Sequence, residues 1–333
     1  MYIVSTMTKR SLRLHAQSGN IAVGLSGGPD SMALLHMLSQ EVAPTTKIHA
    51  LIVDHNLRDN SAEEAQSVLN NVNDWKNVTP VILKWASKKP TTRILEEARA
   101  ARFSLLQEYC STHSIQELYL AHHLDDQAET FLFRLAKGSG LDGLAGMKTK
   151  KAISPQLNII RPLLEHTKQE LLDYCKEHKI SYVQDPTNQN TLYMRPRLRE
   201  SKAILEHEGL TNKRVAQTAK RILRARTALE EITEQTWQIL LLHNDQNFLQ
   251  LNLDELSACP SEIRIRILLK TIDHFSTKNT YPPRLEKVER LHDSIFHIDK
   301  NDAIFQKQTL AGLVFQRKKE KNVNFLIIRP EDT

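Results

Sequence analysis

A short glycine turn between two apolar segments constrains the fold of this 333-residue chain more than any other feature. The segment Ile21–Leu25 predicts a buried strand, and Met32–Leu38 predicts the body of a helix. Between them, Gly27 and Gly28 lack a Cβ atom, so the backbone can adopt positive φ angles and come close to a ligand. The first amides of a helix have no partner within the helix and attract anions. This strand, turn and helix therefore predict a phosphate-binding loop.

The predicted loop consists of six residues, all expected to contribute to nucleotide binding: Ser26, Gly27, Gly28, Pro29, Asp30 and Ser31. Pro29 suits a first helical position, because the N–H that it lacks would have no partner there. No lysine follows the glycines as in a Walker loop, and Asp30 stands in its place, either capping loop amides or acting through Mg²⁺. The alternative is a turn that only caps a helix, but the flanking strand and helix favour nucleotide binding.

Strand-like and helix-like segments alternate after this loop. The predicted strands are Ile48–Val53, Val78–Leu83 and Glu117–Ala121, and the predicted helices are Ala62–Trp75 and Ile94–His113. Strands that alternate with long helices indicate an α/β fold with a doubly wound parallel sheet, covered by helices on both faces. Because ligands bind such sheets at the carboxyl ends of the strands, we expect the functional site there.

A chain of this length exceeds the size at which one core keeps growing, so two or three domains are expected. We predict an N-terminal domain over residues 1–200, a helical linker over 201–243 and a small C-terminal α+β domain over 244–333. The stretch 202–242 predicts a long helical segment with an apolar stripe at Val215, Ala219, Ile222, Leu229 and Ile232. Its other face carries cations, which fit a solvated face as well as a nucleic-acid contact: Lys213, Arg214, Lys220, Arg221 and Arg224.

A second polar segment, His122 to Thr130, directly follows the last predicted strand. Asp126 and Glu129 are three residues apart and therefore share one face of a helix, with His122 close to the preceding turn. The alternative is acidic capping of an ordinary helix, which the helix dipole favours. A zinc site is not predicted, because the spacing matches no common zinc motif. Likewise Gly138–Gly143 matches G-x-G-x-x-G but follows a helix, which argues against a dinucleotide loop.

Composition narrows the class of protein. The net charge of +6 and the pI of about 9.1 suggest an anionic partner, nucleic acid first, without deciding it. Cys110, Cys175 and Cys259 lie far apart and predict neither a disulfide framework nor a cysteine zinc site. No apolar run approaches a membrane span or a secretory signal. We therefore expect a cytoplasmic protein with no membrane partner, although residues 1–29 contain no acid and faintly resemble a transit peptide.

The S-G-G-x-D-S pattern of the loop resembles that of the N-type ATP pyrophosphatases, which cleave ATP to AMP and pyrophosphate while adenylylating a substrate. Further motifs resemble one family among them, tRNA(Ile)-lysidine synthetase, in family order over about residues 21–200. They are V-D-H-N-L-R at 53–58, L-E-E-A-R-A-A-R-F at 95–103, H-H-L-D-D-Q-A-E-T at 122–130 with Arg134, G-S-G-L-D-G-L-A-G-M at 138–147, R-P-L-L at 161–164 and D-P-T-N at 185–188. The fold implied is adenine-nucleotide alpha-hydrolase-like.

This resemblance implies a ligase that joins the ε-amine of free lysine to C2 of the wobble cytidine in a tRNA(Ile) with a CAU anticodon. ATP would adenylylate O2 of the base, and Asp30 with Mg²⁺ would act at the phosphates. Free lysine needs carboxylates, which Asp126 and Glu129 supply. The resemblance also implies that His122 and Arg102 lie at the ATP and adenylate, whereas Arg102 taken alone would be assigned to a helix surface.

Candidate tRNA contacts are Arg195, Arg197, Arg199, Arg221 and Arg224, together with the C-terminal domain. The run Arg195–Arg199 departs from the Arg-Asn pair of many family members, which puts contacts of that asparagine in doubt. The alternatives are a tRNA thiolase on the same loop, which would need a cysteine array that the chain lacks, and a tRNA-binding module without activity. A homodimer is a further possibility, and no base that deprotonates lysine is identified.

Overall fold

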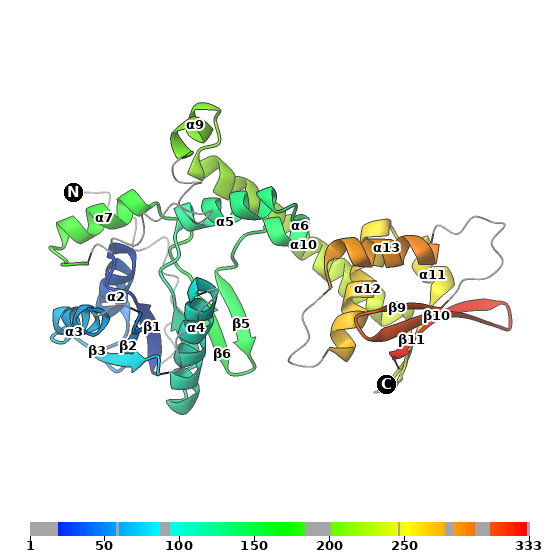
Figure 1. Cartoon of the computed structure of the whole chain (residues 1–333), viewed down its shortest axis with the longest axis horizontal. Helices are drawn as coiled ribbons and strands as arrows, with labels where there is room; N and C mark the ends of the chain where they lie inside the picture. Colours follow the sequence, from blue (N-terminus) through cyan, green and yellow to red (C-terminus); the bar gives the residue numbers. More distant parts are fainter. Residues whose placement is uncertain are drawn as a thin grey trace. The chain divides into compact units, whose positions relative to one another are not determined.

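The computed structural model describes residues 19–57, 60–86, 94–183, 201–245, 247–276, 283–296 and 307–331. The chain divides into two compact units (Figure 1), one of Met1–Ser139 with Gly143–Arg221 and one of Gly140–Asp142 with Ile222–Thr333. This division falls within a long helix, whereas the sequence suggested limits at residues 200 and 243. Those limits remain a prediction about which segments fold independently.

The first unit contains a six-stranded sheet of order β3-β2-β1-β4-β6-β5. Its strands are β1 (Ile21–Leu25), β2 (Ile48–Asp54), β3 (Val78–Lys84), β4 (Glu117–Tyr119), β5 (Lys150–Ser154) and β6 (Leu157–Ile160). All neighbouring pairs are parallel except β5 with β6, which forms an antiparallel edge. The predicted parallel sheet is therefore confirmed, and β5 and β6 add a hairpin that the sequence analysis did not identify.

Helices cover both faces of this sheet, as predicted. The helices that pack on its faces are α2 (Pro29–Glu41), α3 (Ser61–Val72) and α7 (Lys168–Glu177) in one core and α4 (Ile94–Thr112) in the other. Two further helices, α5 (Leu124–Ala136) and α6 (Leu141–Leu144), follow β4 in the chain. Each face of the sheet packs against helices to form a hydrophobic core, and alternate residues of β1 belong to different cores. Val23 packs with residues of α2, α3 and α7, whereas Ala22 packs with residues of α4. Every residue of β1 is buried, as expected of an interior strand.

The predicted long helical stretch over 202–242 is confirmed for most of its length, although it forms two helices and part of its predicted apolar stripe is wrong. The stretch forms α9 (Lys202–His207), α10 (Asn212–Leu240) and the start of a strand, and Gly209 follows α9 with a φ of +84°. Ala219 is buried, but Ile232 is 47% exposed. Thirteen residues separate them, and at 100° per residue they lie about 220° apart, so they cannot share one face.

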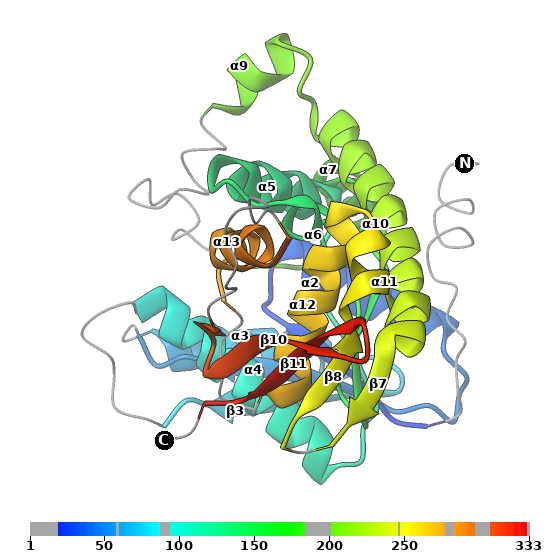
Figure 2. The same cartoon turned by 90° about the vertical axis from the view of Figure 1, so that its right-hand side faces the viewer.

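The C-terminal unit is α+β, as predicted, with an antiparallel sheet of order β7-β8-β11-β10-β9. Its elements are β7 (Leu241–Asn244), β8 (Leu249–Asn252), α11 (Leu253–Ala258), α12 (Ser261–Phe275), α13 (Leu285–Phe296), β9 (Gln308–Leu310), β10 (Leu313–Glu320) and β11 (Val323–Pro330). Figure 2 shows α11 and α12 beside the strands of this sheet. Alternate strand residues such as Leu249 and Leu251, or Leu326 and Ile328, enter one core with these helices.

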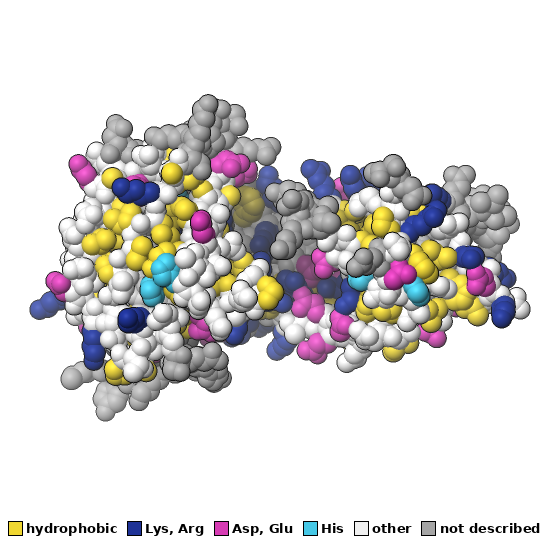
Figure 3. All heavy atoms as spheres, turned by 90° about the horizontal axis from the view of Figure 1, so that it is seen from below, with side chains coloured by type: hydrophobic (Ala, Val, Ile, Leu, Met, Phe, Trp, Pro, Cys, Tyr) yellow, Lys and Arg dark blue, Asp and Glu magenta, His cyan; other side chains and the backbone are white. Residues whose placement is uncertain are grey.

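The surface of the C-terminal unit carries both signs of charge. On the face visible in Figure 3, basic and acidic side chains are intermixed rather than gathered in one patch. Within the described residues, every helix is too short or too polar to span a bilayer.

Candidate active site

The predicted phosphate loop joins β1 to α2, and the Ser31 hydroxyl closes it. Ser31 Oγ accepts a hydrogen bond from the Ser26 amide at 3.2 Å, donates to the Gly28 carbonyl at 3.0 Å and lies 3.1 Å from Ser26 Oγ. The Gly27 carbonyl accepts from the Val183 amide at 2.8 Å. These hydrogen bonds hold the loop in one conformation next to the first amides of α2, which suits an anion-binding site.

The two glycines of the loop differ in whether the fold itself leaves room for a side chain. Gly27 has a φ of +79°, and a Cβ atom there would lie 2.4 Å from Val68 Cγ2. Gly28 is the N-cap of α2 with a φ of −73°, and a Cβ atom there would lie 3.6 Å from Ser26 Oγ, an ordinary contact. The protein itself therefore requires glycine at Gly27, whereas Gly28 is free of any such steric demand.

The start of α5 lies beside this loop, because β1 and β4 are neighbours in the sheet. The link is His123, only 5% exposed. Its Nε2 lies 3.6 Å from Asp30 Oδ2 and 3.5 Å from Asp126 Oδ2, and its Nδ1 lies 3.6 Å from Asp125 Oδ2. One imidazole therefore contacts a carboxylate of the loop and two at the start of α5. The sequence analysis named His122 and missed His123, and nothing in the local pattern distinguishes the two.

These contacts determine the protonation of the cluster. Burial lowers the pKa of His123, but its interactions with Asp125, Asp30 and Asp126 outweigh burial and raise it to about 10. His123 is therefore an imidazolium at neutral pH. Burial raises the pKa of Asp125, yet its close contact with His123 and the hydrogen bonds that it accepts from the Lys168 amide and Asn212 hold this pKa well below its usual range.

Asp126 and Glu129 lie one turn apart on α5, as their spacing predicted. Asp126 Oδ2 accepts a hydrogen bond from the His123 amide at 3.0 Å, so this residue does cap the helix. Burial raises the pKa of Asp126, and the charges of Glu129 and Asp30 add to this effect against the opposing influence of His123. A bound cation would relieve this repulsion among carboxylates, which suits an ammonium group.

Taken alone, the sequence around Arg102 would assign this residue to the surface of a helix. The structure places it elsewhere. A Cβ atom on Gly24 would lie 3.8 Å from Arg102 Nη2, so the guanidinium lies beside β1 near its carboxyl end. Burial lowers the pKa of Arg102, and the charge of Arg99 lowers it further. No carboxylate among the described residues pairs with Arg102. A cation in such a position favours an anionic ligand.

His122 lies at the carboxyl end of β4 and contacts Arg161, which the sequence analysis included in the R-P-L-L motif without assigning it a role. Arg161 Nε donates a hydrogen bond to His122 Nδ1 at 3.3 Å, and Arg161 Nη1 donates to the Lys148 carbonyl at 3.1 Å. Arg161 directly follows β6, so the rule that sites gather at the carboxyl ends of strands could have identified it.

The residues of the site differ in whether they could hold Mg²⁺. No group of three or more His, Cys, Asp or Glu side chains in the described part of the chain is arranged to hold a metal ion. Mg²⁺ that accompanies a nucleotide needs less, because one or two carboxylates and the phosphates suffice. Asp30 fits this role, since its Oδ1 is buried without a hydrogen-bond partner among the described residues.

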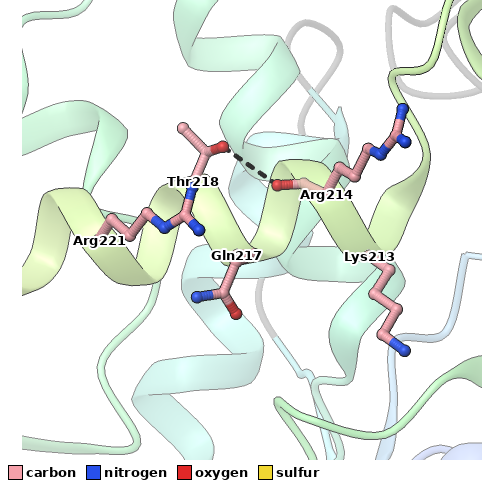
Figure 4. Close-up of a pocket in the computed structure, with 5 residues that line it drawn as sticks. All are labelled: Lys213, Arg214, Gln217, Thr218 and Arg221. Carbon is pink, nitrogen blue, oxygen red and sulfur yellow. Dashed lines mark hydrogen bonds between the residues drawn. The ribbon is translucent and has the colours of Figure 1, made fainter.

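The predicted tRNA contacts fall into two groups. Arg195, Arg197 and Arg199 lie outside the described residues. Arg221 and Arg224 are exposed on α10, and among the described residues neither pairs with a carboxylate. Arg221 helps to line a surface pocket on α10, and Figure 4 shows its five lining residues, all with hydrogen-bond donors: Lys213, Arg214, Gln217, Thr218 and Arg221.

Comparisons with known proteins relate this chain to a family and to a fold. Residues 4–206 match the family model of the PP-loop domain. The tRNA(Ile)-lysidine synthase of Wolbachia pipientis wMel is 33% identical over 315 residues, covering 94% of this chain and 71% of that protein. That of Bradyrhizobium sp. strain BTAi1 is 34% identical over 323 residues, covering 92% and 89%. The U34-tRNA thiolase NcsA from Methanococcus maripaludis has a TM-score of 0.55 at 18% identity, covering 66% of this chain and 80% of that chain, which supports the fold alone.

Proposed function

The chain belongs to the tRNA(Ile)-lysidine synthase family of PP-loop proteins, and from this premise we propose how its site performs such a ligation. The enzyme joins free lysine to C2 of the wobble cytidine in a tRNA(Ile) with a CAU anticodon. The observation that carries the proposal is the convergence of two groups on His123: Asp30 from the phosphate loop and Asp126 from the start of α5.

The reaction must first turn a poor leaving group into a good one. O2 of the cytosine attacks the α-phosphorus of ATP, and the bond to the β-phosphate oxygen breaks with release of pyrophosphate. The loop Ser26–Ser31 and the amides of α2 bind the phosphates, and Arg102 offsets the charge of the adenylate. Asp30 would hold Mg²⁺, which when bound offsets the negative charge that develops on pyrophosphate.

The second step selects the amine. The ε-amine of lysine attacks C2, the bond between C2 and O2 breaks, and AMP leaves with that oxygen while the amine gives up a proton. Asp126 and Glu129 supply the negative charge that a free lysine requires. Their mutual repulsion, which contributes to the raised pKa of Asp126, supports this role, because an ammonium group between them restores balance.

Other parts of the proposal rest on the chain outside this cluster. Arg195, Arg197, Arg199, Arg221 and Arg224 contact the tRNA backbone, and the C-terminal domain adds to this surface. A cytoplasmic location and a homodimer remain predictions.

A direct assay tests the function. The protein is incubated with ATP, radiolabelled lysine and unmodified tRNA, and the digested tRNA is analysed for label on the wobble nucleoside. ATP-dependent label at that nucleoside is expected. ATP-dependent incorporation of sulfur instead would identify a thiolase, and tight tRNA binding without either product would identify a binding module.

Asp126→Asn tests the assignment of the amine site. Asparagine keeps an acceptor for the His123 amide but removes the charge, so the helix cap survives while lysine recognition weakens. The KM for lysine should rise far more than the dissociation constant for ATP. Asp173→Asn on the exposed side of α7 is the matched control and should change neither value. Equal losses in lysine and ATP binding for Asp126→Asn would remove the assignment.

A further inference from the structure

Arg161 and His122 come from neighbouring strands and meet at one edge of the sheet. Arg161 directly follows β6, and His122 lies three residues beyond β4, which pairs with β6 in parallel. The backbones are joined here as well, because the Leu120 amide donates to the Ile160 carbonyl at 2.9 Å. Arg161 is only 8% exposed.

The hydrogen bond between them has one possible direction. An arginine Nε–H is always a donor, because the guanidinium does not lose its proton in proteins. The ring nitrogen that receives it, His122 Nδ1, must therefore be an acceptor with a free lone pair. A neutral imidazole with an acceptor at Nδ1 carries its proton on Nε2. Both the other tautomer and the imidazolium would set one N–H against another.

The orientation of the guanidinium is fixed independently of His122. Arg161 Nη1 donates to the Lys148 carbonyl at 3.1 Å, and the planar group cannot rotate without losing that bond. Burial lowers the pKa of Arg161, and the charge of Arg99 lowers it further. No carboxylate among the described residues pairs with Arg161. Its visible interactions are therefore with His122 and a backbone carbonyl, not with a structural ion pair.

We propose that Arg161 is a positioning residue for His122, holding it as the neutral tautomer that carries its proton on Nε2. This inference deepens the proposed function, because it rests on His122 acting at the ATP and adenylate. In that tautomer His122 is a hydrogen-bond donor through Nε2, suited to a phosphate oxygen. It is not the base that deprotonates lysine, since Nε2 already holds a proton and Nδ1 is taken by Arg161.

Nitrogen NMR of the ¹⁵N-histidine-labelled wild-type protein tests the tautomer directly and needs no activity. The His122 signals are assigned by their absence in His122→Gln. The expected result at about pH 7 is an unprotonated Nδ1 and a protonated Nε2. A protonated Nδ1 overturns the inference. The nitrogen signals of His122 should change in Arg161→Met. An unchanged His122 tautomer in that variant overturns the role of Arg161 as its positioning residue.

Kinetics of two variants separate positioning from charge. Arg161→Lys keeps the charge but loses the rigid fork that reaches both Nδ1 and the carbonyl. Arg161→Met and Arg161→Lys should both slow tRNA-dependent pyrophosphate release about 10- to 100-fold in kcat, as expected of residues that orient a functional histidine. The KM for lysine should stay near the wild-type value. A wild-type rate in Arg161→Lys overturns the inference, because charge alone would then suffice.

A double variant and a matched control complete the test. If Arg161 acts through His122, Arg161→Met should cost little more in a His122→Gln background, and additive losses contradict the inference. Arg266→Lys in the C-terminal unit is the control, since Arg266 is also 8% exposed but pairs with Asp142 and Glu262. It should leave pyrophosphate release unchanged. A wild-type protein that forms no lysidine would refute the proposed function, while the NMR result would still decide the tautomer.

Discussion

Replacement of each loop glycine by alanine should separate the needs of the fold from those of the ligand. Gly27→Ala forces a side chain into the left-handed region at a φ of +79° and sets its Cβ atom 2.4 Å from Val68 Cγ2. Gly28→Ala does neither, because its φ is −73° and the nearest protein atom lies at 3.6 Å. The first change should reduce stability, and the second should reduce ATP binding.

The magnitudes follow from these two contacts. Left-handed backbone costs a non-glycine residue about 1–2 kcal/mol. Forcing an extra methyl group against a packed valine adds about 1–3 kcal/mol. Gly27→Ala should therefore lose about 2–5 kcal/mol, or about 4–20 °C in the melting temperature of a unit of this size. Gly28→Ala should lose less than about 1 kcal/mol, the difference between glycine and alanine at an N-cap.

The assay pairs thermal melting with calorimetric titration of a non-hydrolysable ATP analogue. Gly28→Ala should bind the analogue at least about tenfold more weakly, a loss of about 1.4 kcal/mol, because its methyl group occupies the cradle. The double variant Gly27→Ala with Val68→Ala removes the clash, so it should lose less stability than the sum of the single variants. Equal melting temperatures for the two alanine variants, or a Gly27→Ala protein as stable as wild type, would refute the reasoning.

Three further outcomes are expected. Burial raises the pKa of both Cys110 and Cys175 to about 11, so neither thiol should react with iodoacetamide at about pH 8 until urea is added, and reaction in the native state would contradict this burial. Burial and His178 lower the pKa of His36, so the folded state binds fewer protons than the unfolded state below about pH 6.5 and loses stability as pH falls. In His36→Gln, the melting temperature should fall less as pH is lowered than it does in the wild type. An unchanged dependence of the melting temperature on pH in that variant would contradict this expectation. Finally, charge reversal at Arg221 and Arg224 should weaken tRNA binding and reduce its salt slope by about one per residue, whereas an unchanged slope would mark a solvated face.

Much of the first unit could be predicted because its strands are short, mostly apolar and separated by long helices. β1 is apolar and buried throughout, and β2 and β3 are apolar at most positions, so all three differ clearly from the polar segments around them. The hairpin of β5 and β6 was not predicted from the sequence, because β6 has only four residues and β5 is mostly exposed. The apolar stripe predicted for α10 is wrong at Ile232 because its spacing of thirteen positions from Ala219 places it about 220° around the helix, on a different face.

The site could be predicted in its location but not in all its members. Polar residues at strand ends placed Asp30 and Asp126 at one edge of the sheet. Which of two adjacent histidines turns towards Asp30 depends on the path of the chain after β4, and no local pattern carries that information. His123 was missed for this reason. Arg161 was noted only as part of the R-P-L-L motif and was not placed in the site, because the strand before it was not recognised.

The strand order explains why one edge can serve both steps of the ligation. The sheet runs β3-β2-β1-β4-β6-β5, so the chain reverses its direction of winding between β1 and β4, where ligands of such folds bind. β1 leads into the phosphate loop, β4 leads to His122 and the carboxylates of α5, and β6 leads to Arg161. The residues proposed for phosphate binding, amine selection and histidine positioning therefore follow three neighbouring strands. On this proposal, a substrate base held between the first two would need no change of site between its adenylylation and the attack by lysine, which would limit hydrolysis of the adenylate.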